Sequence, residues 1–284
     1  MFSYNISTNK GNKFYKYLAI PYFIVLVLFV LIPIYIIFLD SIQEINSNNF
    51  FHVSFTFKHY YNFFVNTSFI YVLFRSMIIT FISTFFLVLI SYPLAYIVSK
   101  CKFSIQSILI LLINGTMWVN IILKTHSLVN ILSLIDKIFS INLLETNIAM
   151  FIGFVYLFLP YMFLSIFLSI SKIDPNLIES AKDLGANDKQ IFKKIIFPLS
   201  IPGLNTGIIL VSLQILTNLV VPKYLGPTTI TVISELIENK TFLNGDTKGA
   251  CAIAINLTFL ILYILIFYKK NQFNKTYKPN VQNK

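Results

Sequence analysis

Long apolar stretches alternate with shorter polar ones along the whole 284-residue chain. A helix that crosses a membrane needs about 20 mostly apolar residues, and six stretches meet that requirement. They are residues 17–39, 69–98, 105–123, 147–170, 202–222 and 249–268. The pattern predicts an all-α integral membrane protein in which a six-span domain, residues 17–268, lies between polar tails at 1–16 and 269–284.

Two of these stretches need separate treatment. The first follows Lys10, Lys13 and Lys16, as a secretory signal would, but its apolar run is too long and no small-residue cleavage site follows it. We therefore expect an uncleaved first span. Asn114 and Gly115 interrupt the third stretch, so it can unwind locally if neighbouring helices satisfy the freed backbone groups.

Composition supports a membrane protein. The chain is 56% hydrophobic and 12% charged, whereas soluble domains are about one quarter charged. The net charge of +11 could indicate a nucleic-acid partner, but all the basic residues except Arg75 are lysines. Together with the many Phe, Ile, Asn and Tyr residues, this matches a base-composition bias. We therefore expect no nucleic-acid partner.

The distribution of lysines predicts the orientation of the spans. With the N-terminus inside, 15 lysines fall in inner segments and 6 in outer ones, and positive residues collect on the cytoplasmic side. Six spans then leave both termini in the cytoplasm. The tail after Lys269 is rich in Asn and Lys and is expected to be solvated.

Catalytic and metal-binding patterns are missing from the sequence. The two cysteines (Cys101, Cys251) and three histidines have no metal-ligand spacing, and no phosphate-binding glycine loop occurs. No carboxylate lies within a predicted span, which disfavours a proton- or sodium-coupled carrier and a membrane enzyme. Arg75 lies near the outer end of the second span and can extend its charge outward.

One polar segment, residues 172–201, breaks the apolar pattern in the middle of the chain; we name it the central loop. It carries nine charged residues between Lys172 and Lys194. Burying them at the bilayer centre would cost roughly 20 kcal/mol or more. The central loop must therefore lie in water.

Helix signals within the central loop predict two short helices joined by a sharp turn. Asp174 can cap a helix that begins at Pro175, and Gly185 stands where such a helix ends. Asn187 and Gln190 form a second capping signal. The expected apolar stripes are Leu177, Ile178, Ala181 and Leu184 on the first helix and Ile191, Phe192, Ile195 and Ile196 on the second.

Pro198 is expected to end the second helix, and Pro202 with Gly203 to open the next span. Ser180, Ala181 and Ala186 are small, so another surface could approach the backbone closely. From the residues alone, two functions remain open for the central loop: docking of a partner protein, or an amphipathic element lying on lipid.

The spacing within the central loop resembles a known motif. Glu179-Ser180-Ala181 is followed by three residues, Gly185, nine residues, Ile195, one residue and Phe197-Pro198. This resembles the cytoplasmic "EAA" loop of permease subunits in ATP-binding-cassette importers, which reads EAA, three residues, G, nine, I, one, L, P. Ser180 and Phe197 are mild departures from alanine and leucine.

The resemblance implies a fold, a site and partners. The fold is that of a type I importer permease, and the loop docks in a cleft of a separate ATPase homodimer. That ATPase would use ATP and Mg²⁺, while this chain would bind no cofactor or metal. The other implied partners are a homologous but distinct second permease chain, an external substrate-binding protein and the bacterial inner membrane. The implied coupling residues are Glu179, Ser180, Ala181, Leu184, Gly185, Ala186, Phe192 and Pro198.

Further motifs resemble the spermidine/putrescine branch of that family. The segment 92–96 reads YPLAY, as in that branch, and Trp118 followed by Lys124-Thr125 is similar to its tryptophan and Arg-Thr. Residues 233–250 resemble its last outer loop. Thr116 replaces the usual proline, and Thr247-Lys248 replaces Trp-Pro. The resemblance implies a polyamine importer, with thiamine, sulfate, molybdate and ferric iron as the alternative substrates, and a secondary carrier or channel as the alternative class.

Polar residues in the third and fifth spans are candidates for a substrate pathway. Gln214, Thr217 and Asn218 are spaced to share one helical face. Trp118 and Asn120 are the candidates in the third span. The alternatives are hydrogen bonding between helices for the polar residues and interface anchoring or packing for Trp118.

Two other patterns concern packing. Gly203 and Gly207 are spaced for close approach of two helices. The aromatic-rich outer segment 50–64 predicts an amphipathic element at the membrane interface, with contact to the binding protein as the alternative.

Overall fold

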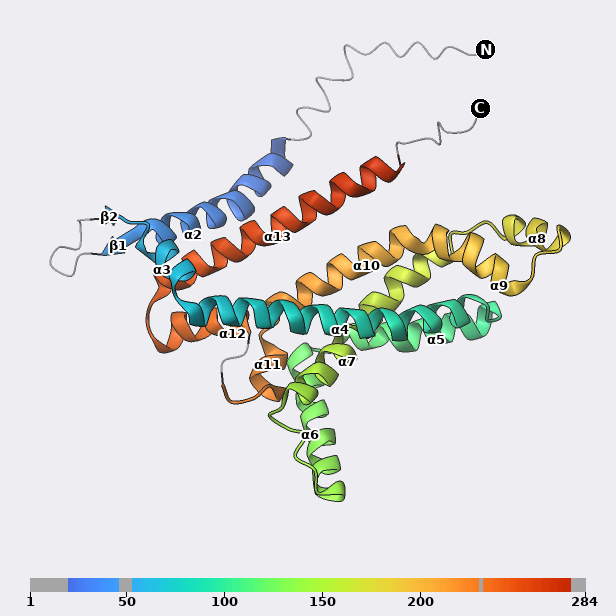
Figure 1. Ribbon diagram of the computed structural model, residues 1–284, viewed down its shortest axis with the longest axis horizontal. Coiled ribbons are helices and arrows are strands. Elements are labelled where there is room, and N and C mark those ends of the chain that lie inside the picture. Colours follow the sequence, from blue (N-terminus) through green and yellow to red (C-terminus); the bar gives the residue numbers. More distant parts are fainter. Residues whose placement is uncertain (1–19, 46–52, 230–231, 277–284) are drawn as a thin grey trace, which may run out of the picture. The chain divides into compact units, whose positions relative to one another are not determined.

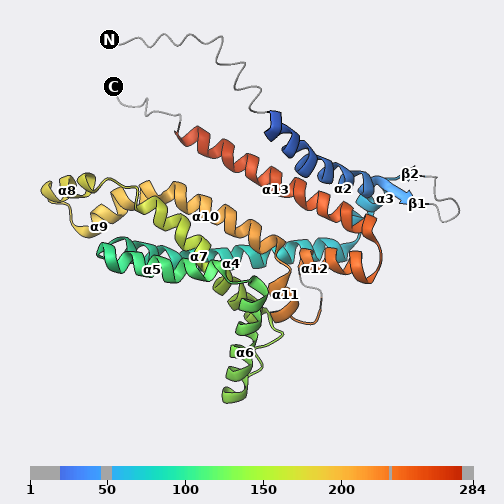
Figure 2. The ribbon, with the colours of Figure 1, turned by 180° about the vertical axis from the view of Figure 1, so that it is seen from behind.

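The computed structural model covers residues 1–284 and describes residues 20–45, 53–229 and 232–276, with side chains up to residue 266. Contacts divide the chain into two compact units, one of residues 1–65 and 240–262, the other of residues 66–239 and 263–284. Figures 1 and 2 show the elements of both units from opposite sides. The predicted tail at 1–16 lies outside the described residues.

The first unit contains a long apolar helix and a small hairpin. The helix Ile20–Ile42 includes a π-helical turn, η1 (Val27–Leu31), and α2 (Ile32–Ile42). The strands β1 (Gln43–Ile45) and β2 (Val53–Phe55) pair in antiparallel fashion with Glu44 opposite Ser54. The remaining elements are α3 (Lys58–Val65), the π-helical turn η4 (Asn239–Leu243), which begins one residue before the unit, and the first half of α13 (Thr247–Thr276).

The aromatic segment 50–64 forms β2 and α3. Phe63 is buried, whereas Phe57, Tyr61 and Phe64 are exposed. The Tyr60 and Ser41 hydroxyls lie 2.6 Å apart, and Ser41 donates its own hydrogen to the Phe38 carbonyl. Tyr60 therefore donates to Ser41 and ties α3 to the end of α2. Phe50 and Phe51 lie outside the described residues, and the location of α3 at a membrane interface stays a prediction.

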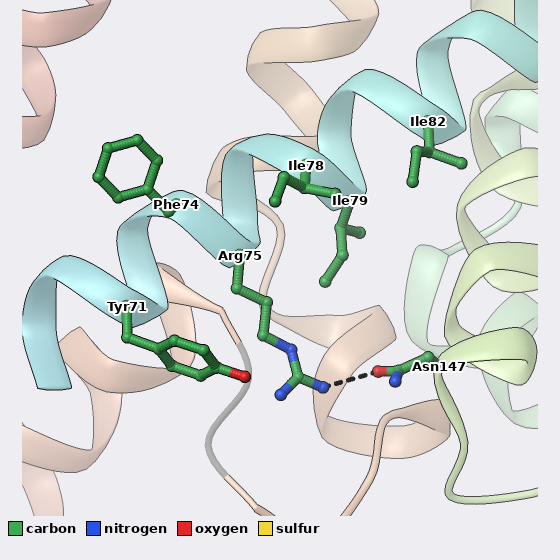
Figure 3. Close-up of a pocket in the computed structure, with 7 residues that line it drawn as sticks. All are labelled: Tyr71, Phe74, Arg75, Ile78, Ile79, Ile82 and Asn147. Carbon is green, nitrogen blue, oxygen red and sulfur yellow. Dashed lines mark hydrogen bonds between the residues drawn. The ribbon is translucent and has the colours of Figure 1, made fainter.

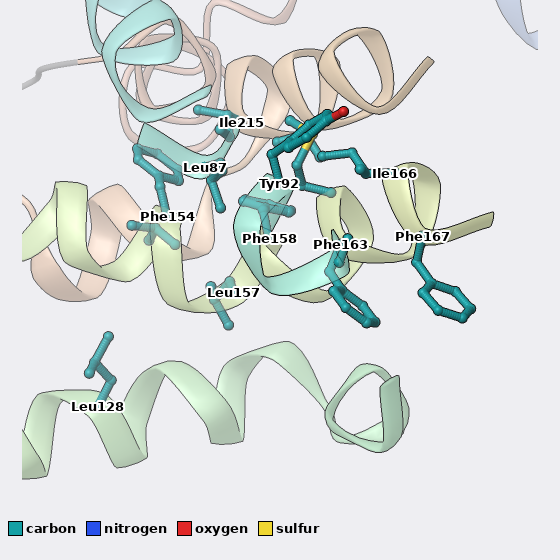
Figure 4. Close-up of a cluster of buried hydrophobic side chains, with 14 of the residues drawn as sticks. Leu87, Tyr92, Leu128, Phe154, Leu157, Phe158, Phe163, Ile166, Phe167 and Ile215 are labelled. Carbon is teal, nitrogen blue, oxygen red and sulfur yellow. The ribbon is translucent and has the colours of Figure 1, made fainter. Parts of the chain in front are cut away.

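Three helices form the centre of the second unit: α4 (Thr67–Ser99), α7 (Asn147–Ile170) and α10 (Phe197–Thr217). They contact one another pairwise. Figure 4 shows Phe154, Leu157 and Phe158 of α7 beside Leu87 of α4; all four side chains are at most 4% exposed. Among the described residues, half of the twelve largest fully buried side chains belong to α7, so it is the central helix of this unit.

Small residues allow α7 and α10 to touch. A Cβ atom on Gly203 would lie 2.2 Å from the Ser169 Cβ, and one on Gly207 would lie 3.0 Å from the Ser165 Cβ. The Ser165 hydroxyl donates to the Gly203 carbonyl over 2.8 Å. The prediction that these glycines serve close helix packing is confirmed.

The remaining elements of this unit are short or bent. They are α5 (Phe103–Gly115), the 3₁₀ turn η2 (Thr116–Trp118), α6 (Ile121–Phe139), α8 (Pro175–Asp183), α9 (Asp188–Ile191), the π-helical turn η3 (Phe192–Ile196), α11 (Val220–Leu225) and α12 (Ile233–Glu238). In Figures 1 and 2, α8 and α9 lie at one end of α10, and α11 and α12 lie near the other.

The described residues contain five helices able to cross a membrane by length and apolarity. A sixth crossing requires that the arms Phe103–Trp118 and Ile121–Phe139, bent by 102°, count as one span. The interruption that the sequence allows in the third stretch, 105–123, is therefore present, but the chain turns at Val119 and Asn120 and not at Asn114 and Gly115. Val119 and Asn120 leave the helical backbone conformation, with ψ angles of 136° and 133°. The Asn120 side chain accepts the Ile122 amide over 2.8 Å, so a new helix begins there.

The fifth span also differs at both ends from the prediction of 202–222. It is a single helix from Asp188 to Thr217, so Pro198 does not end a helix. Phe197 donates its amide to Phe192 five residues back, and this π-helical turn precedes Pro198, which has no amide hydrogen to donate. At the other end, Asn218 is extended.

A turn held by the half-buried Asp246 precedes α13. The Asp246 carboxylate accepts the Lys240 ammonium over 2.6 Å and the Gly249 amide over 2.8 Å. A Cβ on Gly249 would lie 2.2 Å from a carboxylate oxygen of Asp246, so glycine is needed there. Burial raises the pKa of Asp246, but these hydrogen bonds and the positive charges of Lys240 and His59 outweigh it and hold that pKa below its ordinary value.

This turn should therefore loosen in acid. Because the pKa of Asp246 is lower in the folded state, its stabilising contribution is complete above the ordinary value of 3.8 and is lost as the pH falls through the lower folded value. Hydrogen exchange of residues 239–249, corrected for the intrinsic rate, should show the loss. Asp246→Asn should exchange fast at every pH, and an unchanged pH profile in that variant would contradict the assignment.

Candidate functional site

The central loop folds as its sequence predicts over residues 174–190. The Asp174 side chain accepts the Asn176 amide over 3.0 Å, and Pro175 occupies the first turn of α8. Asp174 therefore satisfies one of the free amides at the start of α8.

A left-handed glycine ends α8. Gly185 has φ +82°, the Gly185 amide donates to Lys182 over 2.8 Å and the Ala186 amide to Ala181 over 3.0 Å. This pair of bonds is the Schellman arrangement, in which glycine is favoured because it has no Cβ. No atom outside the immediate neighbourhood lies within 4 Å of a Cβ built on Gly185, so the outer side of the turn is open.

A full capping box begins the second helix. The Asn187 side chain accepts the Gln190 amide over 2.9 Å, and the Gln190 side chain accepts the Asn187 amide over 3.0 Å. Two amides are satisfied reciprocally. The loop therefore holds its shape through its own side chains.

The predicted apolar stripe on α8 divides into two sets. Ile178 and Ala181 are half-buried against the core of this unit, whereas Leu177 and Leu184 are 51% and 89% exposed. Exposed apolar side chains at a helix end, next to an open glycine turn, are typical of a surface that another molecule covers.

The other predicted coupling residues occupy different surroundings. Glu179 and Ser180 are exposed, and the Ser180 hydroxyl donates to the Asn176 carbonyl over 2.8 Å. Ala186 is half-buried against the core. Phe192 is half-buried, and its ring lies 5.1 Å from that of Tyr96 and 5.9 Å from that of Tyr92. Phe192 thus contacts α4 within this unit.

The pathway candidates of α10 do not share one helical face. Thr217 is the last residue of α10 and donates its hydroxyl to Leu213, while Asn218 lies beyond the helix. The Asn218 side-chain oxygen accepts a hydrogen bond from the Val221 amide over 2.9 Å. The Asn218 backbone carbonyl accepts one from the Ser234 hydroxyl over 2.7 Å. Asn218 therefore holds the turn into α11. The Gln214 side-chain oxygen is buried without a hydrogen-bond partner.

The candidates near the bend lie on either side of it. Trp118 is 84% exposed, and Asn120 caps α6. Lys124 is buried in the first turn of α6, with its ammonium 5.6 Å from the Tyr156 ring centre. Burial of this amine under an aromatic face of α7 fixes the start of α6.

Arg75 lines an open pocket formed by α4 and the first residue of α7. Figure 3 shows the Arg75 guanidinium extending toward Asn147, to which it donates over 2.8 Å. Tyr71, Phe74, Ile78 and Ile79 line the same pocket. Arg75 thus joins α4 to the first residue of α7, a contact that spacing in the sequence could not show. Among the described residues, no group of three His, Cys, Asp or Glu side chains could hold a metal ion.

The fold and the central loop place the chain in a class of membrane transport subunit. The chain belongs to the family described as binding-protein-dependent transport system inner membrane component, whose model matches residues 60–275. It is thus a multi-pass inner-membrane permease of the ATP-binding-cassette importer class and not an enzyme.

Individual relatives are similar over almost the whole chain. The spermidine/putrescine transport system permease protein PotB of Haemophilus influenzae is 33% identical over 274 residues, 92% of this chain and 96% of PotB. The PotB of Escherichia coli K12 is 30% identical over 255 residues, 86% of this chain and 92% of its own.

Solved structures share the fold. A chain of a bacterial ABC transporter that imports alginate superimposes with a TM-score of 0.75 at 18% identity, covering 95% of this chain and 98% of that one. A chain of the MetNI methionine ABC transporter superimposes with a TM-score of 0.58 at 14% identity, covering 72% and 94%.

Proposed function

We propose that this chain is the permease subunit of a polyamine importer driven by a separate ATPase. The observation that carries the proposal is the preformed central loop, with its open turn at Gly185 and the nearly fully exposed Leu184. An apolar side chain presented in this way suits a cleft on a partner protein.

The polyamine substrate rests on the relatives. The two PotB proteins named above are similar over more than four fifths of this chain, and both are named for spermidine and putrescine. Thiamine, sulfate, molybdate and ferric iron are therefore less favoured. A secondary carrier or channel is set aside, because the family is one of binding-protein-dependent systems.

The remaining parts of the assembly follow from this class. A second, homologous permease chain completes the pathway, an external binding protein delivers the substrate, and an ATPase homodimer binds the central loop in the cytoplasm. The lysine distribution supports both termini on the cytoplasmic side. Trp118, Asn120, Gln214, Thr217 and Asn218 stay candidates for the pathway.

Uptake of radiolabelled putrescine and spermidine by the complete assembly in proteoliposomes tests the proposal. Uptake should require ATP and the binding protein, and excess unlabelled thiamine, sulfate, molybdate or ferric iron should not compete. ATP-independent uptake driven by an ion gradient, without a retained ATPase, would refute the class.

Leu184→Ser tests the docking surface directly. Burial of a leucine contributes about 1.5–3 kcal/mol, so the variant should bind the ATPase about 10- to 100-fold more weakly. Leu243→Ser is the matched control, because Leu243 is also highly exposed, at 77%, but lies outside the central loop. Equal ATPase retention in the two variants, measured by co-purification, would argue against docking at Leu184.

A further inference from the structure

The central loop is joined by the backbone to two of the three core helices. It follows Ile170, the last residue of α7, and it continues through α9 and η3 into α10 as one helix, Asp188–Thr217. Helix α4 ends at Ser99 and has no such backbone connection. Any movement of the loop must therefore reach α4 through side chains.

Aromatic rings make that contact. The Phe192 ring, which opens η3, meets Tyr96 at 5.1 Å with an interplanar angle of 74° and Tyr92 at 5.9 Å with an angle of 90°. Phe197 lies 5.8 Å from Tyr92. Edge-to-face contacts at these distances are the arrangement that aromatic pairs prefer. The two tyrosines are four residues apart and thus lie on one face of α4.

A chain of two hydrogen bonds also connects α4 to the start of α10. The Tyr92 and Ser200 hydroxyls lie 2.7 Å apart, and the Ser200 hydroxyl donates to the Phe197 carbonyl over 2.9 Å. Ser200 has one hydroxyl hydrogen, so Tyr92 donates to Ser200. Tyr92 is 9% exposed and Ser200 is fully buried. Figure 4 shows Tyr92 within the core beside Phe158 and Ile166 of α7.

The helix around Phe192 has the π-helical geometry that is common at functional positions. Phe192–Ile196 forms one such turn between α9 and α10. Because α9 begins at Asp188, only four residues before Phe192, displacement of the turn at Gly185 carries this ring with it.

We propose that Phe192, Tyr92 and Tyr96, supported by Ser200, transmit movement of the central loop to α4. The proposal rests on the proposed function and extends it. These are positioning residues: they pass movement of the loop to α4 and are not proposed to contact ATP or substrate. Phe192 is thereby assigned an inward contact with α4 rather than a contact with the ATPase.

The test measures substrate uptake per ATP hydrolysed by the complete assembly in proteoliposomes. Phe192→Ala should retain the ATPase and its stimulation by the loaded binding protein, while uptake per ATP falls about tenfold, a typical coupling between sites. Phe192→Tyr should keep uptake per ATP close to that of the unaltered protein, because tyrosine also has an aromatic ring. Tyr92→Phe keeps the ring contacts and loses only the Ser200 bond, so its decrease should be smaller.

Phe151→Ala is the matched control. It removes a ring pair of similar geometry between α7 and α4, since Phe151 and Phe86 lie 5.1 Å apart at 80°, away from the central loop. Its uptake per ATP should equal that of the unaltered protein.

Three results would overturn the proposal. If Phe192→Ala leaves uptake per ATP unchanged, the Phe192 ring does not transmit movement to α4. If the variant loses ATPase retention and uptake in parallel, Phe192 is a docking residue instead. If Phe192→Ala does not fold, an unchanged ratio in Phe192→Leu, which removes the ring but keeps an apolar side chain of similar volume, has the same force. Failure of the unaltered chain to retain an ATPase would instead refute the proposed function.

Discussion

Replacing Gly185 by arginine is expected to leave the protein folded in the membrane and to abolish its association with the ATPase. The left-handed backbone at φ +82° penalises any residue with a Cβ by about 1–2 kcal/mol. Inside this chain, the new side chain would meet nothing within 4 Å of its Cβ. The steric cost therefore falls on the partner that approaches the turn.

Two variants separate docking from strain. Gly245→Arg introduces the same side chain at φ +67°, again with nothing within 4 Å, and should keep the ATPase. Gly185→Asn tolerates the left-handed backbone better than other residues and should retain part of the binding. Co-purification of the ATPase with each variant is the measurement, and normal retention by Gly185→Arg would exclude the turn from the interface.

Gly203→Val is expected to disrupt the contact between α7 and α10. The Cβ would lie 2.2 Å from the Ser169 Cβ and 2.8 Å from the Ser165 carbonyl oxygen, and backbone cannot yield as a flexible side chain does. Overpacking of this kind typically costs about 1–3 kcal/mol. The thermal transition in detergent should therefore fall by about 2–12 °C.

Gly115→Val supplies the comparison for this variant. Gly115 ends α5, and nothing lies within 4 Å of its Cβ, so its transition temperature should stay close to that of the unaltered chain. A second change, Ser169→Gly, removes the nearest clashing atom and should partly restore Gly203→Val. Equal transition temperatures for Gly203→Val and Gly115→Val would contradict the close packing.

Local signals allowed the central loop to be predicted from the sequence. The cap at Asp174, the turn at Gly185 and the box at Asn187 each depend on a few neighbouring residues, so the sequence alone contains the needed information. The spacing of Gly203 and Gly207 was informative for the same reason, since small residues four apart lie on one helical face.

The bends could not be predicted, because they depend on contacts distant in the chain. Asn218 looked like one more polar residue of a long helix, yet it leaves the helix and bonds to the turn that follows and to Ser234. Gly115, the expected break, keeps an ordinary helical backbone, and the chain instead turns at Asn120. Hydropathy measures how apolar a stretch is and not where its axis changes direction.

The sequence predicts only part of the candidate site, because tertiary packing decides which of its side chains are buried. Helical spacing placed Leu177, Ile178, Ala181 and Leu184 on one stripe, but only tertiary packing decides that Ile178 and Ala181 turn to the core while the leucines stay exposed. The YPLAY motif alone does not predict that Tyr92 and Tyr96 contact Phe192, because that contact joins segments distant in the chain. Their spacing of four residues was the signal that could have placed both rings on one face.

The capped ends of the two helices in the central loop affect how fast a partner can bind. Since Asp174, Gly185 and the Asn187–Gln190 pair satisfy the helix ends within the chain, the loop has little conformational entropy left to lose when a partner binds. Docking can then proceed as a rigid-body encounter without a folding step, and dissociation between transport cycles does not require the loop to refold before the next encounter.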